Sequence, residues 1–321
     1  MKKKKIVIVL GPTASGKSSV ALALAKRFGG FLISADSRQV YKGMDIGTNK
    51  DKGEWRQKKF YVEGVEECLI DVVSPNDEFT VGDWLEHVEK TIFERPNKLP
   101  IIVGGTGLYI SALVNNFKLP VGRDEKLRLK FERLLAKEGI QSVIDEIKKI
   151  DPDIEQKIDS KNPRRVIRAA EICFSTSLPF ERAKGKCDYE ILQISVQLAR
   201  EKLYEKINQR VDEMAAAGLI QEVKRLLDAG CRRDSTAMTG IGYRQICRFL
   251  NHEISGTTAI ESVKRDTRQY AKRQMTWFKR DKTIHWVENK SEALRLVKNF
   301  LHVMVRESFD ELRINSHHDR S

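Results

Sequence analysis

The stretch that most constrains the fold is residues 11–18, a glycine-rich loop that follows an apolar, β-branched run at residues 6–10. It fits the pattern G-x-x-x-x-G-K-[ST], in which backbone N–H groups, a lysine and a hydroxyl surround phosphate groups. Residues 19–26 continue with a helical pattern, which is the strand-to-helix context that such a match requires. The sequence therefore predicts a polyphosphate or pyrophosphate site, in which Ser18 can also hold Mg²⁺. Its residues are Gly11, Pro12, Thr13, Ala14, Ser15, Gly16, Lys17 and Ser18.

The size and charge of the chain set further limits. At 321 residues the chain can hold one large domain or two ordinary ones. A net charge of +13 with a pI near 9.4 favours a polyanionic partner, although lysines that only keep the chain soluble are an alternative. The five cysteines form no C-x-x-C pair, so we expect neither a disulfide framework nor a zinc site.

The sequence contains no stretch that approaches the roughly 20 apolar residues of a membrane span. The apolar run near the start is also too short for the hydrophobic part of a signal peptide. We therefore expect a cytoplasmic protein with no membrane partner.

Two further motifs belong beside the phosphate loop if the strands form a parallel sheet. Asp36 follows a predicted strand at residues 31–35, and a second glycine-rich turn with Thr106 follows a predicted strand at residues 99–103. Ligands of open α/β sheets bind outside the carboxyl ends of the strands, so both motifs should face one crevice. Asp36 can equally cap a helix, and the sequence leaves these two interpretations even.

The same pattern disfavours ordinary ATP hydrolysis. A typical ATPase ends the strand beside its phosphate loop in an acidic residue that holds Mg²⁺. Here Val103 is followed by glycine, and only Asp71, within a strand predicted at residues 68–73, occupies a comparable position.

The fold class indicated is α/β: a phosphate-loop NTPase-like core with a parallel sheet, an inserted all-helical domain and a helical C-terminal region. The core is assigned to residues 1–120 and 188–306, the insertion to residues 121–187, and a polar tail, expected to be disordered, to residues 307–321. Further strands and helices are expected from hydrophobic periodicity. They are a strand at residues 189–196 and helices at residues 80–95, 124–138, 141–149, 163–174, 201–217, 219–229, 242–250 and 257–279.

Positive charge gathers in two of the predicted helices. Arg164, Arg165 and Arg168 begin the helix at residues 163–174, and guanidinium groups suit phosphate. Residues 257–282 carry eight Lys or Arg against three acidic residues, with aromatic side chains interleaved. Such stripes suit looped or single-stranded RNA, where bases stack and phosphates pair. The alternative is that the basic faces of both predicted helices are only exposed to solvent.

Six segments match one family in order. They are residues 11–18, 33–48, 100–109, 163–171, 240–245 and 267–278. Together they resemble the bacterial-type tRNA dimethylallyltransferases, which move a five-carbon prenyl group from dimethylallyl diphosphate to the exocyclic N6 amine of the adenosine 3′ to the anticodon. One departure stands out, because Glu67-Cys68 replaces the paired histidines that usually precede Leu-Ile-Asp in that family.

The resemblance implies roles for these residues. The phosphate loop would hold the diphosphate of the prenyl donor rather than a nucleotide, with Mg²⁺ as cofactor and with Lys17, Arg268 and Arg273 around the anion. Asp36 would accept the proton of the adenine amine and Thr106 would help to position the reactants. The tRNA anticodon stem-loop would contact Asp36, Ser37, Arg38, Gln39, Thr106, Arg128, Arg164, Arg165, Val166, Ile167, Arg168, Tyr243, Arg244, Gln245, Arg268, Lys272 and Arg273. The protein is expected to act as a monomer.

Three other functions fit part of the pattern. A small-molecule or nucleoside phosphotransferase explains the phosphate loop but gives no task to the helical insertion or the basic helix. A non-catalytic, nucleotide-gated RNA-binding module explains loop and charge, but not why Asp36 and Thr106 both line the crevice. A prenyltransferase of free adenylate is a closer relative that would not need the insertion.

Overall fold

The computed structural model describes residues 3–117, 124–180 and 185–301. The chain divides into two compact units, one formed by Met1–Val114 with Asp188–Ser321 and the other by Asn115–Cys187. Within the described ranges, no helix is both long enough and apolar enough to cross a membrane. The polar tail predicted at residues 307–321 lies outside the described residues.

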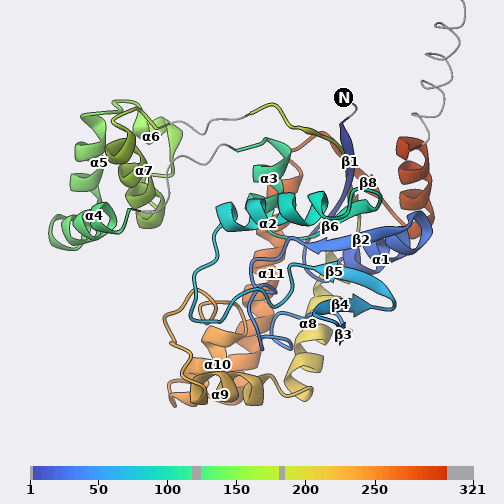
Figure 1. Cartoon of the computed structure of the whole chain (residues 1–321). Helices are drawn as coiled ribbons and strands as arrows, with labels where there is room; N and C mark the ends of the chain where they lie inside the picture. Colours follow the sequence, from blue (N-terminus) through green and yellow to red (C-terminus); the bar gives the residue numbers. More distant parts are fainter. Residues whose placement is uncertain (1–2, 118–123, 181–184, 302–321) are drawn as a thin grey trace, which may run out of the picture. The chain divides into compact units, whose positions relative to one another are not determined.

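The larger unit is built on an eight-stranded sheet in the order β3-β4-β5-β2-β6-β1-β7-β8 (Figure 1). Every pairing is parallel except those that join β4 to β3 and to β5. The sheet is therefore the mostly parallel one that the sequence predicts. Its strands are β1 (Lys4–Leu10), β2 (Gly30–Ser34), β3 (Glu54–Arg56), β4 (Lys59–Val62), β5 (Val65–Cys68), β6 (Leu99–Gly104), β7 (Tyr189–Val196) and β8 (Ile284–Val287).

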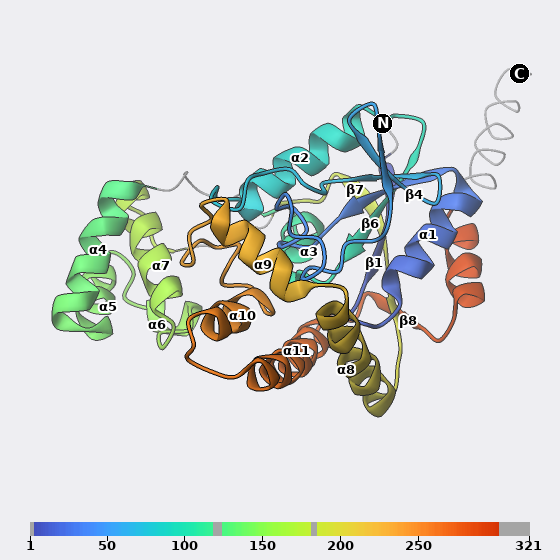
Figure 2. The ribbon, with the colours of Figure 1, turned by 90° about the horizontal axis from the view of Figure 1, so that it is seen from below.

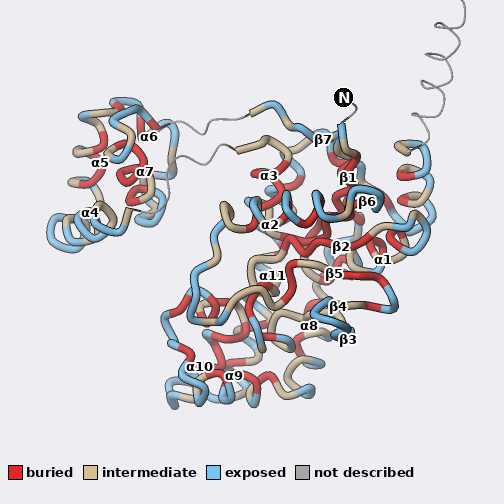
Figure 3. Tube along the Cα trace, in the orientation of Figure 1, coloured by how far each residue is buried: buried red, intermediate tan, exposed pale blue. Residues whose placement is uncertain are grey.

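Helices cover both faces of this sheet because the central strands are apolar on both sides. Alternate residues of β1 point to opposite faces: Ile6 and Ile8 pack with α2 (Val81–Phe93) and α3 (Gly107–Val114), whereas Val7 and Val9 pack with α1 (Lys17–Phe28). Residues 290–301 are also helical, and side chains from this helix join the face that α1 covers. The strands at the centre of the unit are accordingly buried along their length (Figure 3).

Four further helices of this unit lie beyond the carboxyl ends of the central strands (Figure 2). Residues of three of them form a separate apolar core with Val40, Tyr41 and Met44 from the segment after β2. They therefore stand next to the edge where a parallel sheet binds its ligands. They are α8 (Arg200–Ala216), α9 (Leu219–Asp228), α10 (Tyr243–Leu250) and α11 (Gly256–Phe278), of which the last three supply that core.

The regular elements of the smaller unit are helices within its described residues, and the unit has its own apolar core. The Asn162 side chain caps α7 by accepting from the backbone N–H groups of Arg164 and Arg165, and a proline occupies the first turn. The core brings Phe131 together with Val143, Ile147 and Val166. The helices are α4 (Glu125–Glu138), α5 (Ile140–Lys148), α6 (Ile154–Lys157) and α7 (Pro163–Thr176).

Two sequence-based assignments are wrong. The strand expected at residues 68–73 is instead β5, which ends at Cys68, because Leu69 and Asp71 adopt positive φ angles of 64° and 52° that a strand does not accommodate. The end of the chain is not only helical, because β8 extends the sheet beside β7. The β3–β4 hairpin also went unpredicted. Its strands are short and lie at the edge of the sheet.

Candidate active site

The phosphate loop predicted from the sequence joins β1 directly to α1. Gly16 forms the N-cap of α1 with a φ of 88°, a left-handed conformation that glycine adopts without strain. Lys17 is therefore the first residue of the helix, and its ammonium donates a hydrogen bond to the Pro12 carbonyl oxygen over 3.3 Å. Burial lowers the pKa of Lys17 to about 8, although the charge of Asp36 opposes that shift. The loop thus places a poorly solvated cation at the helix N-terminus, where an anion is favoured.

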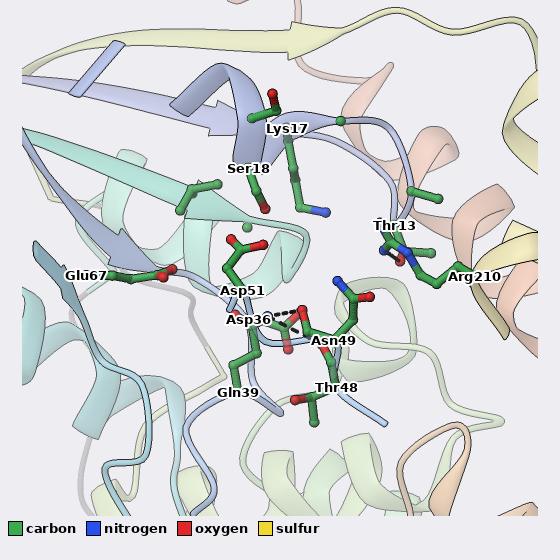
Figure 4. A pocket seen from close by; sticks show the side chains of 15 residues that line it. Thr13, Lys17, Ser18, Asp36, Gln39, Thr48, Asn49, Asp51, Glu67 and Arg210 are labelled. Atoms are coloured by element: carbon green, nitrogen blue, oxygen red, sulfur yellow. Dashed lines mark hydrogen bonds between the residues drawn. The ribbon is translucent and has the colours of Figure 1, made fainter. Parts of the chain in front are cut away.

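A cavity of about 250 Å³ lies against this loop, and residues from several segments of the chain line it (Figure 4). Side chains of Lys17 and Ser18 reach it from α1, and Asp36 reaches it from the carboxyl end of β2. The sequence-based expectation that loop and Asp36 face one crevice is therefore confirmed. The remaining lining comes from Thr13, Ala14, Gly16, Ser19, Gln39, Thr48, Asn49, Asp51, Glu67, Val103, Gly104 and Arg210.

Asp36 does not cap a helix. Its Oδ1 accepts the backbone N–H of Arg38 over 2.8 Å, so it stabilises a tight turn that leads away from β2. The neighbouring N–H of Ser37 donates to the Thr106 hydroxyl over 3.0 Å. Thr106 is not among the residues that line the cavity, and its observed contact holds the turn that carries Asp36. The carboxylate is thus fixed in place from two neighbouring strand ends.

Gln274 of α11 connects the two glycine-rich turns. Its Oε1 accepts the N–H of Thr13 over 3.0 Å, and its Nε2 donates to the Gly105 carbonyl over 2.8 Å. A Cβ atom at Gly105 would lie 2.3 Å from that amide nitrogen, so only glycine allows this approach. The basic helix therefore helps to shape the phosphate loop, a contact that sequence reasoning did not identify.

A second anchor holds the segment that supplies Thr48 and Asn49 to the cavity. Glu222 of α9 is buried, and its carboxylate accepts the N–H groups of Asp45 and Ile46 at 2.8 Å and of Gly47 at 3.0 Å. The Tyr243 hydroxyl donates to the same group over 2.7 Å. Four donors thus satisfy one buried carboxylate and fix the loop that it holds.

Three ionisable side chains of the cavity are not among the sequence-based site candidates. Arg210 of α8 donates to the Thr13 hydroxyl over 3.2 Å and adds positive charge beside Lys17. Asp51 interacts with the Ser18 hydroxyl; burial raises the pKa of this acid, and Ser18 and Lys17 oppose the shift. Burial, and then the charge of Asp51, raises the pKa of Glu67 to about 8. The only signal for Glu67 in the sequence is its place in the Glu-Cys pair that departs from the family pattern.

A neighbouring cavity of about 330 Å³ shares Lys17, Asp36 and Arg210 with the first. Arg273 and Tyr270 line this cavity, and the Arg273 guanidinium lies over the Tyr270 ring. Arg244 also lines it and forms an ion pair with Asp266 at 2.6 Å. A cavity lined with cationic and aromatic groups suits a nucleic acid base and its phosphates. Ser37, Arg38, Tyr243, Arg244 and Arg273 from the predicted tRNA-binding set lie here.

Other members of the predicted tRNA-binding set lie elsewhere in the larger unit. The Arg268 guanidinium hydrogen-bonds Asn208, and Lys272 is exposed; neither lines the two cavities. Gln245 is buried, where it caps Gly242 and donates to Asp266, so its side chain supports the fold. Tyr243, which also lines the second cavity, is likewise buried, and its hydroxyl donates to Glu222.

In the smaller unit, several of the predicted tRNA-binding arginines form ion pairs with acidic side chains. Arg128 and Arg168 both pair with the buried Glu171, at 3.3 Å and 2.9 Å, and Arg165 approaches Asp159 at 3.6 Å. Arg164 is exposed. The side chains of Val166 and Ile167 are buried in the core, because the apolar groups of α7 face the other helices and not solvent. The predicted contact of these two residues with tRNA would therefore have to be made by their backbone.

Comparison with known proteins identifies the family. The sequence model of the IPP transferase family matches residues 39–281, and that of isopentenyl transferases matches residues 4–61. The chain belongs to the IPP transferase family. A tRNA dimethylallyltransferase of Geobacter metallireducens is 43% identical over 89% of this chain and 93% of its own length. One from Acetivibrio thermocellus is 42% identical over 89% and 92%.

Solved structures of IPP transferases share the fold. The full-length tRNA isopentenylpyrophosphate transferase of Bacillus halodurans superposes with a TM-score of 0.69 at 37% identity, covering 97% of this chain and all of that one. A eukaryotic dimethylallyltransferase described as acting on tRNA gives a TM-score of 0.74 at 25% identity, over 96% and 80%. The mixed α/β architecture is therefore that of IPP transferases.

Proposed function

We infer that this protein is a tRNA dimethylallyltransferase, an enzyme that transfers the dimethylallyl group from dimethylallyl diphosphate to an adenosine of tRNA. The observation that carries this conclusion is a single cavity that joins the loop of Lys17 to the carboxylate of Asp36. This reaction needs two things from the protein: groups that stabilise the leaving diphosphate, and a group that accepts the proton of the amine. The similarity to named tRNA dimethylallyltransferases over most of the chain supports it.

In the proposed reaction, the N6 amine of the adenine attacks the allylic carbon of the donor, and a carbon–nitrogen bond forms as the carbon–oxygen bond to diphosphate breaks. Pyrophosphate leaves with the bonding electron pair toward Lys17, the loop amides and Arg210. The attacking nitrogen becomes positively charged and gives its proton to the Asp36 carboxylate. Thr106 acts as a positioning residue because it holds the turn that carries Asp36.

Mg²⁺ fits the donor atoms around Ser18. Within the described ranges, no group of three or more His, Cys, Asp or Glu could hold a metal ion. Mg²⁺ usually takes one or two carboxylates and completes its shell with water and substrate phosphates, so a hydroxyl and few acids suffice. Bound there, it would stabilise the negative charge that develops on the diphosphate.

The finer assignments rest on the same family. We propose that the larger unit is a phosphate-loop NTPase-like core, that the unit of Asn115–Cys187 is an inserted helical domain, and that both bind the tRNA anticodon stem-loop. The modified base is the adenosine 3′ to the anticodon, which must leave its stack to reach the cavity beside Asp36. The enzyme acts as a cytoplasmic monomer. Arg164, Lys272 and Arg244 supply exposed positive charge for this contact.

The test is to incubate the full chain with radiolabelled dimethylallyl diphosphate, Mg²⁺ and total tRNA, and to map the labelled nucleotide by mass spectrometry. We expect label on N6 of the adenosine next to the anticodon. Label on free adenylate but not on tRNA, or phosphate transfer from ATP without prenyl transfer, contradicts the proposal.

A further inference from the structure

The cavity acid Glu67 has no task in the proposed mechanism. Glu67 belongs to β5, its side chain is 5% exposed, and its Oε2 is buried with no hydrogen-bond partner. An ionised buried carboxylate oxygen without a partner is costly, so the charged form of Glu67 needs a ligand. Figure 4 shows the Glu67 carboxyl group directed into the cavity, toward Asp51.

The strand geometry places Glu67 in the cavity and keeps its neighbours out. Alternate residues of a strand face opposite sides, so Glu66 and Cys68 point away from Glu67. Glu66 pairs with Arg95 at 2.7 Å, and Cys68 packs against the core on the face covered by α2. The register of Glu67 beside Leu32 of β2 fixes this orientation. Cys68 therefore adds no sulfur ligand to the cavity.

Asp51 and Ser18 complete a group of oxygen donors. Asp51 interacts with the Ser18 hydroxyl, and its charge is felt by Glu67. The segment that follows Asp51 lies close against the β3–β4 hairpin. A Cβ atom at Gly53 would lie only 2.4 Å from the Tyr61 carbonyl oxygen, so glycine is needed there. In Figure 4 the hydroxyl of Ser18 and both carboxyl groups point into the same part of the cavity.

We propose that Ser18, Asp51 and Glu67 together form a divalent-cation site, in which the unpartnered Glu67 carboxylate is a direct ligand of Mg²⁺ or Mn²⁺. Two carboxylates that face each other in a buried site repel unless a cation lies between them. Hard oxygen donors of this kind suit Mg²⁺ and Mn²⁺, and the open remainder of the shell leaves room for diphosphate oxygens. The proposal rests on the proposed function only for that last partner.

The test measures cation binding by the full chain without donor or tRNA. Mn²⁺ is titrated into the protein, and free Mn²⁺ is followed by electron paramagnetic resonance. We expect one site per chain, and we expect Glu67→Gln and Asp51→Asn each to weaken binding at least about tenfold, since even outer-shell changes reach that size. Glu63→Gln is the matched control, because Glu63 is an exposed acid in the turn before β5. It should change affinity less than about twofold.

Thermal unfolding gives a second measurement. Mg²⁺ should raise the midpoint of the parent and of Glu63→Gln but not of Glu67→Gln, because only a bound cation stabilises the folded state. Without cation, Glu67→Gln should be at least as stable as the parent. Mn²⁺ affinity that is unchanged in both Glu67→Gln and Asp51→Asn overturns the proposal, as does a Mg²⁺ shift that survives in both. Intact cation binding with no prenyl transfer instead counts against the proposed function.

Discussion

Replacing Glu222 with glutamine tests how the active-site loop is held. The carboxylate accepts three backbone N–H groups and the Tyr243 hydroxyl, all between 2.7 and 3.0 Å. An amide has one oxygen and one NH₂ group, so one pair of donors must face the nitrogen. The less costly orientation turns the nitrogen toward Gly47 and Tyr243, because the tyrosine hydroxyl can then accept instead. The Gly47 N–H loses its partner in that arrangement.

The expected cost follows from those contacts. A buried donor left without an acceptor costs about 1–3 kcal/mol, and hydrogen bonds to a neutral amide are about 1 kcal/mol weaker than those to a carboxylate. Opening of the loop should therefore become easier by at least about 2 kcal/mol. Because 1.4 kcal/mol corresponds to a factor of ten, the amides of Asp45, Ile46 and Gly47 should exchange hydrogen at least about 30-fold faster.

The assay is native-state hydrogen exchange followed by mass spectrometry on peptides that contain residues 44–49. Asp228→Asn, an exposed acid of the same helix, is the control and should leave exchange unchanged. Tyr243→Phe removes one donor but leaves Gly47 paired, so its effect should be smaller, at about tenfold or less. If Glu222→Gln is folded and its loop exchanges within about threefold of the parent, the loop is held by other contacts and our reasoning is wrong.

Three further predictions concern the chemistry and the RNA contact. Asp36→Asn keeps the side-chain shape but cannot accept a proton, so single-turnover prenyl transfer should fall by roughly 10² or more with tRNA binding retained; transfer near the parent rate would mean that another group is the base. The pKa of Lys17 is lowered to about 8, so the lysine is charged below that pH and neutral above it. Pyrophosphate affinity should therefore fall between pH 7 and 9 more steeply in the parent than in Lys17→Met. Equal slopes would refute the role of Lys17 in binding the anion. Arg164→Ala should lower the salt slope of single-stranded RNA binding by about 0.7 if the arginine contacts one phosphate. An unchanged slope would identify a solvated face.

Local sequence patterns were enough to predict the centre of the site. The strand, the glycine-rich loop and the helix that carry Lys17 and Ser18 are contiguous, so their geometry depends on neighbouring residues. Asp36 follows the strand β2 closely, and parallel strands bring their carboxyl ends to one edge of the sheet. The mostly parallel sheet followed for the same reason.

Contacts between distant segments could not be predicted in this way. Gln274 reaches Thr13 across 261 residues, and Arg210 reaches it across 197. Neither residue type has a preference that reveals such a partner, because the contact exists only once α8 and α11 have packed. Glu222 likewise lies in an amphipathic helix, where one buried acid among apolar residues gives no indication of the loop that it holds.

Strand register decided the remaining residues. The sequence shows Glu66, Glu67 and Cys68 side by side, but a shift of one residue would turn a different acid into the cavity. The positive φ angles of Leu69 and Asp71 end β5 at Cys68, and backbone bonds from Asp71 to Gln39 and from Val72 to Val40 hold the chain after it. These bonds join segments about thirty residues apart in the chain. Pairing between strands therefore determines which side chain faces the phosphate loop. The local sequence pattern does not reveal that pairing.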